Sequence, residues 1–164
     1  LGGVGGMDAI LCARAGIGNI SGVDPDTFKI SNINRQMLAL SSTVDEYKSV
    51  ATEKHLKDIN PFLKTNFQNI KVTEENVYSL IKGHDIVLEA LDDMPSRIIV
   101  HRAAKEMNIP SVSMSGSPPH RGFISTFLPN GISYESALNI NTHGKKISDP
   151  EVTNFVQNLK KQRA

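Results

Sequence analysis

The sequence predicts an α/β domain with a doubly wound, mostly parallel sheet and helices on both faces of that sheet. Apolar segments of strand length alternate with helical segments, an order that favours βαβ units with right-handed crossovers. Two of the predicted strands end in acidic residues, at Asp24 and at Asp92. Ligands of such sheets bind beyond the carboxyl ends of the strands, so these two ends mark a candidate site. The pattern indicates a Rossmann-like fold.

Length and composition limit the range of functions. At 164 residues the chain is long enough to bury the core of one domain. A formal net charge of +1 gives no support for bulk electrostatic binding to nucleic acid or to a membrane surface. No apolar run is long enough to span a bilayer. Cys12 is the single cysteine, which excludes an internal disulfide and favours a reducing, cytoplasmic location.

The chain opens with a glycine-rich turn, LGGVGG at residues 1–6, which precedes a helical segment at residues 7–15. Gly2, Gly3 and Gly5 would let the backbone approach a phosphate, and the helix would offer free N–H groups to it. A phosphate-binding glycine turn normally follows a strand, so we expect the first strand of the sheet to lie upstream of this sequence. Taken alone, the glycines fit a flexible terminus equally well.

A dense group of recognition side chains follows the strand predicted at residues 17–23. The carboxylate of Asp24 could accept hydrogen bonds from the hydroxyls of a ribose. Residues 31–36 (SNINRQ) then supply amides and a guanidinium, which suit a phosphate or a carboxylate. The alternative interpretation is a solvated loop in which Arg35 forms an ion pair.

Residues 47–60 have the periodicity of a helix that the Asn60-Pro61 pair terminates. The apolar residues of its predicted inner face are Val50, Ala51, Leu56 and Ile59. Lys48 lies at the start of this helix, where the helix dipole disfavours a cation. An anion bound between Lys48 and the helix end would explain this placement, and a solvated lysine is the alternative.

The second half of the chain continues the alternation of strands and helices. Strands are predicted at residues 63–70, 84–91, 109–114 and 123–128, and helices at 74–81, capped by Thr73, and at 96–107. Strand 84–91 ends at Asp92 and Asp93, which could share a nucleotide and its Mg²⁺ with Asp24, since Mg²⁺ takes one or two carboxylates plus phosphate oxygens. One of the two aspartates is expected to cap the next helix instead.

The pattern changes after residue 128. We assign residues 1–138 to the main domain and residues 139–164 to a flexible crossover segment and a C-terminal helix near residues 152–160. In the helix at 96–107, Arg97 and Arg102 are expected on the solvent side. His120 has no second ligand at metal spacing and is interpreted as a residue of the loop at 115–122.

Five motifs occur together and in order: GGVG at residues 2–5, RAGIG at 14–18, VDPD at 23–26, SNINRQ at 31–36 and LDD at 91–93. In this combination the chain resembles the ThiF/MoeB/HesA family, the adenylating domains related to ubiquitin-activating enzymes. The likeness extends from Leu1 to about Leu128. The Asn60-Pro61 and Ile109-Pro110 pairs also lie where that family has them.

The resemblance implies an ATP- and Mg²⁺-dependent adenylyltransferase. Its substrate would be a carboxylate, commonly the C-terminus of a ubiquitin-like sulfur-carrier protein or of a peptide. Residues 1–138 would form the ATP-binding adenylation domain, and a homodimer is implied. The implied catalytic residues are Arg35, Lys48 and Asp92, with Asp92 as the Mg²⁺ ligand. The implied nucleotide-binding residues are Gly2, Gly3, Gly5, Asp24, Asp26, Asn32, Arg35, Gln36, Lys48, Leu91 and Asp92.

The sequence also departs from the family pattern. Members with a structural zinc carry two Cys-x-x-Cys pairs, but the position of the first pair reads YESA here, at residues 134–137, so we expect no zinc. Asp93 stands where many members have Asn. Cys12 lies on the wrong helix for transthiolation and is interpreted as a packing residue. Recognition of the acyl substrate is expected in the loop at 115–122, in the tail and upstream.

Three alternative functions stay open. A tRNA-modifying dehydratase or cyclase of the same superfamily would make tRNA the partner, although the weak net charge gives it little support. A non-catalytic partner subunit would not need Asp24, Arg35, Lys48 and Asp92 together. An NAD(P)-dependent oxidoreductase fits Asp24 and the glycines, but hydride transfer has no evident use for residues 32–36.

Overall fold

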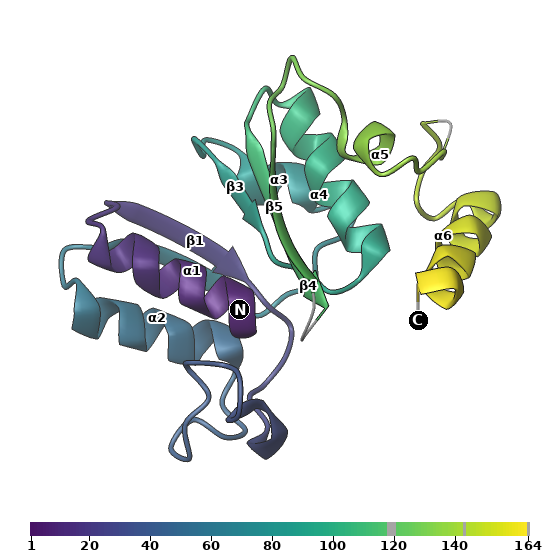
Figure 1. Cartoon of the computed structure of the whole chain (residues 1–164). Coiled ribbons are helices and arrows are strands. Elements are labelled where there is room, and N and C mark those ends of the chain that lie inside the picture. Colours follow the sequence, from purple (N-terminus) through teal and green to yellow (C-terminus); the bar gives the residue numbers. More distant parts are fainter. Residues whose placement is uncertain (118–120, 143, 164) are drawn as a thin grey trace. The chain divides into compact units, whose positions relative to one another are not determined.

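The computed structural model describes residues 1–117, 121–142 and 144–163, which form two compact units, Leu1–Lys71 and Val72–Ala164 (Figure 1). The first unit contains α1 (Gly3–Arg14), β1 (Asn19–Val23), the 3-10 helix η1 (Ile30–Asn32), α2 (Lys48–Ile59) and β2 (Lys64–Gln68). The second unit contains α3 (Val77–Ile81), β3 (Val87–Glu89), α4 (Met94–Glu106), β4 (Ser111–Ser117), β5 (Arg121–Phe127), α5 (Tyr134–Ala137) and α6 (Pro150–Arg163).

The first unit is a βαβ arrangement. β1 and β2 pair in parallel from Asn19↔Lys64 to Val23↔Gln68, and α2 lies between them in the chain. The buried residues under this pair are Ala9, Ala13, Leu56 and Leu63. A parallel pair needs such a crossover, so the predicted α/β class is confirmed here.

The segment between β1 and α2 is folded around a core of its own rather than being a solvated loop. Phe28, Leu38, Ala39 and Ala51 form this buried cluster. The Thr43 hydroxyl donates to Leu38 O at 2.9 Å and accepts from the Leu40 N–H at 2.8 Å. Residues 31–36 therefore lie on a structured turn.

The second unit has a three-stranded sheet in the order β3-β4-β5. β3 pairs in parallel with β4, and β5 pairs antiparallel with β4 from Ser111↔Phe127 to Ser117↔Arg121. The strand expected at residues 123–128 is thus an antiparallel edge on a parallel pair, a common feature of α/β sheets.

Several predicted boundaries are wrong for identifiable reasons. α1 begins at Gly3 rather than Met7, so Gly3, Gly5 and Gly6 are helical despite the low helix propensity of glycine. α3 begins only at Val77, and Thr73 does not cap it: the Thr73 N–H instead donates to Asn76 Oδ1 at 2.8 Å. β3 spans only Val87–Glu89, and beyond its end the Leu91 N–H donates to the Glu89 side chain at 2.6 Å.

The helix faces also differ from the prediction. On α2, Val50 is 52% exposed, while Ser49 and Thr52 are buried beside Ala51. On α4, the guanidinium groups of Arg97 and Arg102 are not solvated but are largely buried and paired with glutamates. The prediction that Ala51 and Leu56 lie on the inner face of α2 is confirmed, since both are fully buried, but the apolar positions did not reveal the polar groups that share the inner faces of both helices.

Apolar side chains of residues 134–142 and 144–156 pack against Ile98 of α4. The core of the second unit consists of Ile98, Tyr134, Ile140, Ile147, Val152 and Val156. α6 includes the helix predicted near residues 152–160. The functional division at residue 138 stays a prediction. Within the described ranges, no helix is long and apolar enough to cross a membrane.

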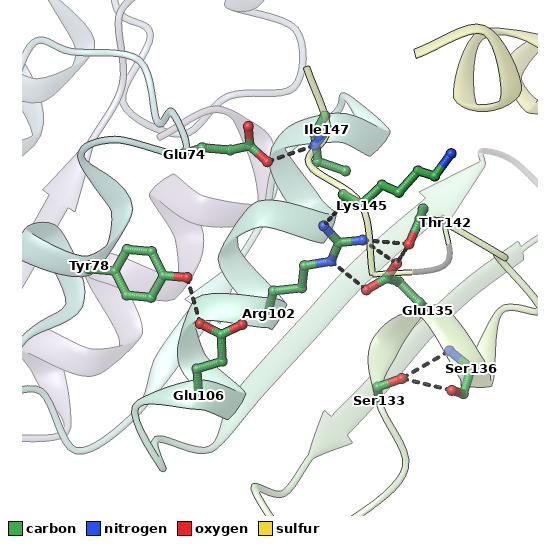
Figure 2. Close-up of polar contacts among 10 residues, drawn as sticks. All are labelled: Glu74, Tyr78, Arg102, Glu106, Ser133, Glu135, Ser136, Thr142, Lys145 and Ile147. Atoms are coloured by element: carbon green, nitrogen blue, oxygen red, sulfur yellow. Dashed lines mark hydrogen bonds and ion pairs between the residues drawn. The ribbon is translucent and has the colours of Figure 1, made fainter. Parts of the chain in front are cut away.

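Arg102 fastens this C-terminal segment to α4 (Figure 2). Its Nε and Nη2 each donate to Glu135 at 2.7 Å, and its Nη1 donates to Lys145 O at 2.7 Å. Thr142 also bonds to both Arg102 and Glu135. Further along the chain, the Ile147 N–H donates to Glu74 Oε1 at 2.7 Å.

Burial alone would raise the pKa of the Glu135 carboxyl, but hydrogen bonds from Arg102 and Thr142, together with the charge of Arg102, outweigh it and lower that pKa. A pKa that is lower in the folded state makes a stabilising contribution at pH values above the unfolded pKa. This contribution is lost as the pH falls through the folded pKa.

Replacing Glu135 with Gln should therefore destabilise the protein near neutral pH, and the difference from wild type should shrink as the pH falls below 4.5, the ordinary value for a glutamate. Urea unfolding at a series of pH values measures both quantities. Asp85→Asn, a change at an exposed carboxylate of the same unit, is the control. A stability difference for Glu135→Gln that is independent of pH would contradict the assignment.

Candidate active site

Asp24 follows β1 and is the centre of the group of candidate residues in the first unit. It is buried, with 8% of its surface exposed. Its Oδ1 accepts a hydrogen bond from the Asp26 N–H at 2.9 Å, and the Leu1 nitrogen lies 2.5 Å from its Oδ2. A carboxylate has about four acceptor positions, so these contacts leave capacity for ligand hydroxyls.

Lys48 connects the end of β1 to the start of α2. Its Nζ lies 3.0 Å from Asp26 Oδ2 and 3.9 Å from Asp24 Oδ1, and its backbone N–H donates to Asp26 O at 3.0 Å. Lys48 is only 8% exposed, so the solvated-lysine interpretation is wrong. The two carboxylates compensate the unfavourable position of a cation at a helix start.

The glycine turn lies against residues 31–36. A Cβ placed on Gly3 would lie 3.3 Å from Arg35 O, which is tighter than ordinary contact, so glycine allows this close approach of two backbones. Gln36 contacts the same turn, because a Cβ on Gly2 would lie 3.5 Å from Gln36 Nε2. No side chain caps α1 and no acidic residue lies in its first turn. The start of this helix is therefore accessible to an anion.

Gln36 carries an unsatisfied group at this point. The residue is 8% exposed, and its Oε1 is buried with no hydrogen-bond partner. A buried polar group without a partner is costly, so such an atom next to a glycine turn fits a site that a polar ligand completes. This orphaned amide and the glycine cradle together fit a nucleotide.

Arg35 and Asn32 lie on the same turn. Arg35 is exposed, and its Nη1 donates to Ser31 O at 2.6 Å and to Asn34 Oδ1 at 3.0 Å. The Asn32 Oδ1 accepts the Lys29 N–H at 3.0 Å. Asn32 thus shapes the turn, while a guanidinium with five N–H donors keeps some of them for a ligand.

The group of candidate residues in the second unit follows β3. Asp93 caps α4, because its Oδ1 accepts the Ser96 N–H at 3.1 Å, and the expectation that one of the two aspartates is a cap is confirmed. Asp92 is exposed, and its carboxylate has no hydrogen bond or ion pair within the part of the chain that the structure describes. Of the two carboxylates, Asp92 is the one free to bind a ligand.

Leu91 is held by side chains that the sequence analysis missed. Its N–H donates to Glu89 Oε1 at 2.6 Å, and Arg97 Nε donates to its carbonyl at 2.6 Å. The sequence held a signal for these contacts. Glu89 is a glutamate within an otherwise apolar strand, and Arg97 is an arginine in the first turn of the helix that follows.

The structure brings the predicted residues together in two groups. Gly2, Gly3, Asp24, Asp26, Gln36 and Lys48 are connected by the contacts above within the first unit, with Asn32 and Arg35 on the adjoining turn. Gly5 lies in the first turn of α1. Leu91 and Asp92 belong to the second unit. His120 and part of the loop at 115–122 lie outside the described residues.

Cys12 and the YESA segment add no reactive group to either group of candidate residues. Burial raises the pKa of the Cys12 thiol and the charge of Asp8 raises it further, which disfavours the thiolate and agrees with a packing role. The YESA segment forms α5, where Tyr134 is buried in the core. The expectation of no zinc stays a prediction.

Comparison with known proteins places these observations in a family. The sulfur carrier protein adenylyltransferase of Thermus thermophilus is 32% identical over 98 residues, which are 60% of this chain and 36% of that protein. The E. coli tRNA N6-threonylcarbamoyladenosine dehydratase TcdA, solved in complex with ATP, is 31% identical with a TM-score of 0.68, over 70% of this chain and 48% of TcdA.

A third likeness concerns the fold alone. E. coli MccB is 18% identical with a TM-score of 0.75, over 98% of this chain and 47% of MccB. The chain spans less than half the length of each of these three proteins. The model of the ThiF family matches residues 1–159, and the chain therefore belongs to the ThiF family.

Proposed function

We propose that the protein is an ATP- and Mg²⁺-dependent adenylyltransferase that activates a carboxylate. The observation that carries this proposal is the cluster of Asp24, Asp26 and Lys48 at the end of β1, next to an uncapped helix start and the unpartnered amide of Gln36. The carboxylate of Asp24 can accept hydrogen bonds from ribose hydroxyls. The ammonium of Lys48 and the free N–H groups at the start of α1 can bind phosphates. The structural relative TcdA was solved with ATP and with AMP.

In the proposed reaction, a carboxylate oxygen of the substrate attacks the α-phosphorus of ATP. One P–O bond forms, and the bond to pyrophosphate breaks. Negative charge develops on the non-bridging oxygens and on the departing pyrophosphate, where Lys48 and Arg35 would stabilise it. No general base is required, because the substrate carboxylate is already ionised near neutral pH.

Asp92 is the residue that we propose for Mg²⁺. Its carboxylate is exposed, whereas that of Asp93 is engaged as a helix cap. Among the described residues no three His, Cys, Asp or Glu side chains converge on one point. Mg²⁺ commonly takes one or two carboxylates and otherwise binds phosphate oxygens and water, so the proposal requires only the carboxylate of Asp92. When bound, the ion would neutralise phosphate charge.

The proposed acyl substrate is the C-terminus of a ubiquitin-like sulfur-carrier protein or of a peptide, as the name of the Thermus thermophilus relative suggests. tRNA is the second candidate, favoured by the likeness to TcdA. The net charge of +1 favours the carrier protein. A cytoplasmic homodimer completes the proposal, by analogy with the family.

Asp92→Asn should abolish magnesium-dependent ATP–pyrophosphate exchange while leaving the fold intact, because the change removes one charge from an exposed side chain. Asp93→Asn is the matched control, since asparagine caps a helix as well as aspartate does. It should keep both stability and exchange. Normal exchange by Asp92→Asn would remove this residue from the mechanism.

Lys48→Met should lower the rate of exchange by a factor of about a hundred or more, as loss of a group that stabilises transition-state charge usually does. Lys54→Met, at an exposed position on the same helix, should leave the rate unchanged. Because Lys48 also compensates the buried Asp24, thermal unfolding of each variant is recorded. A folded Lys48→Met protein with wild-type exchange would contradict the proposed role.

The two substrate classes predict different stimulation of exchange. A small carrier protein with a free C-terminal carboxylate should stimulate exchange by the wild-type protein, whereas unmodified or modified tRNA should not. Stimulation by tRNA alone would establish the second candidate. Nucleotide binding without exchange under either condition would indicate a non-catalytic subunit and contradict the proposal.

A further inference from the structure

A buried polar network lies behind β3 in the second unit. The Glu89 side chain is 0% exposed and that of His101 is 1% exposed. Glu89 Oε2 accepts the Ser113 hydroxyl at 2.9 Å and lies 3.3 Å from His101 Nε2, and Glu89 Oε1 lies 3.4 Å from Arg97 Nε. A buried carboxylate destabilises a fold unless it is paired and hydrogen-bonded, so packing alone gives no reason for Glu89.

The network continues away from the candidate site into the core. His101 Nδ1 lies 2.7 Å from Ser111 Oγ, and its ring stacks on that of Tyr134 with centroids 4.2 Å apart. His101 on α4 and Ser113 on β4 therefore fix the position of the Glu89 carboxylate. Neither of them has a hydrogen bond to residues 91–93 among the described contacts.

The network is directed at a single backbone position. Glu89 accepts the N–H of Leu91, and Arg97 donates through both Nε and Nη2 to its carbonyl. Both polar backbone groups of Leu91 are thus bound by side chains rather than by a neighbouring strand. Two residues later, Asp93 is held by the Ser96 N–H. Asp92 lies between two anchored residues, while its own carboxylate has no hydrogen bond or ion pair to any residue that the structure describes.

We infer that Glu89 and Arg97 are positioning residues for Asp92. They fix the backbone before Asp92, so that its carboxylate is presented in one orientation without being bound to the protein. This inference rests on the proposed function, in which Asp92 is the ligand for the Mg²⁺ that accompanies ATP. Groups that orient a metal ligand commonly change metal affinity by a factor of about ten to a hundred when they are removed.

Glu89→Gln and Arg97→Met test the inference in the intact protein. Gln has the shape of Glu but loses its charge, and Met keeps the aliphatic part of Arg without its donors. Each variant should raise the Mg²⁺ concentration for half-maximal ATP–pyrophosphate exchange by about tenfold, with the KM for the carboxylate substrate unchanged. Arg97→Lys, which keeps one donor and the charge, should recover part of the loss.

Ile98→Val is the matched control for lost stability. Ile98 is fully buried on the same helix but has no contact with Leu91 among those described, and the change should destabilise the protein by removing one methyl group from its core. It should leave the Mg²⁺ dependence unchanged. An equal shift in this control would mean that destabilisation alone explains the effect, and would overturn the inference.

Amide hydrogen exchange gives a readout that needs neither metal nor turnover. The Leu91 amide should be protected in the wild-type protein and should exchange at least about tenfold faster in Glu89→Gln, because its acceptor is weakened. The Ser96 amide, bound by Asp93, is the internal reference. If the wild-type protein catalyses ATP–pyrophosphate exchange and both variants show an unchanged Mg²⁺ dependence, the inference is overturned but the proposed function is not. An inactive wild type would overturn the proposed function, and with it the premise of the inference.

Discussion

The first unit depends on the ion pairs that Lys48 makes with Asp24 and Asp26. Through them, and through the bond from the Lys48 N–H to Asp26 O, the end of β1 is fixed to the first residue of α2. Each charge needs the others: Asp24 is buried, and Lys48 lies at the wrong end of a helix for a cation. The segment from residue 27 to residue 46 is closed between these two points, which sets the position of the turn at residues 31–36.

In the second unit, charged side chains also fix the chain at the end of a strand, but with another division of roles. Here also a carboxylate follows the end of a strand. Different residues, however, supply the carboxylates that bind the backbone and the carboxylate that faces solvent. Glu89 and Asp93 hold backbone N–H groups, and Asp92 between them has no protein partner among the described residues. A site that binds an ion reversibly needs a polar side chain that the protein holds in one orientation but leaves free to bond to the ligand. In the first unit, the orphaned Oε1 of Gln36 meets the same description.

The sequence was sufficient to predict the features that depend on local pattern. The order of strands and helices, the acidic residues Asp24 and Asp92 in the segments that follow β1 and β3, and the presence of a helix cap at residues 92–93 all follow from neighbouring residues. Lys48 could be recognised as unusual, but not as buried, because its partners come from the loop after β1. The family resemblance suggested the proposed roles of Arg35 and Gln36, which periodicity alone leaves undetermined.

The missed features depend on contacts between distant residues. Glu89 lies in an apolar run, and its partners Arg97, His101 and Ser113 come from α4 and β4. Arg102 was expected in solvent because its partner Glu135 lies on α5, more than thirty residues away. On α2, the small polar residues Ser49 and Thr52 are buried although their side chains are not apolar. The pattern of polar and apolar residues contains no information on which residues are in contact, and a polar side chain is buried where it finds a bonding partner.

The most direct test of the account is a crystal structure of the protein with Mg²⁺ and a non-hydrolysable ATP analogue. We predict one nucleotide with its ribose hydroxyls on Asp24, its phosphates contacted by Lys48 and Arg35, and its Mg²⁺ bound by Asp92. A nucleotide bound away from the end of β1, or an Mg²⁺ without Asp92 among its ligands, would contradict the account.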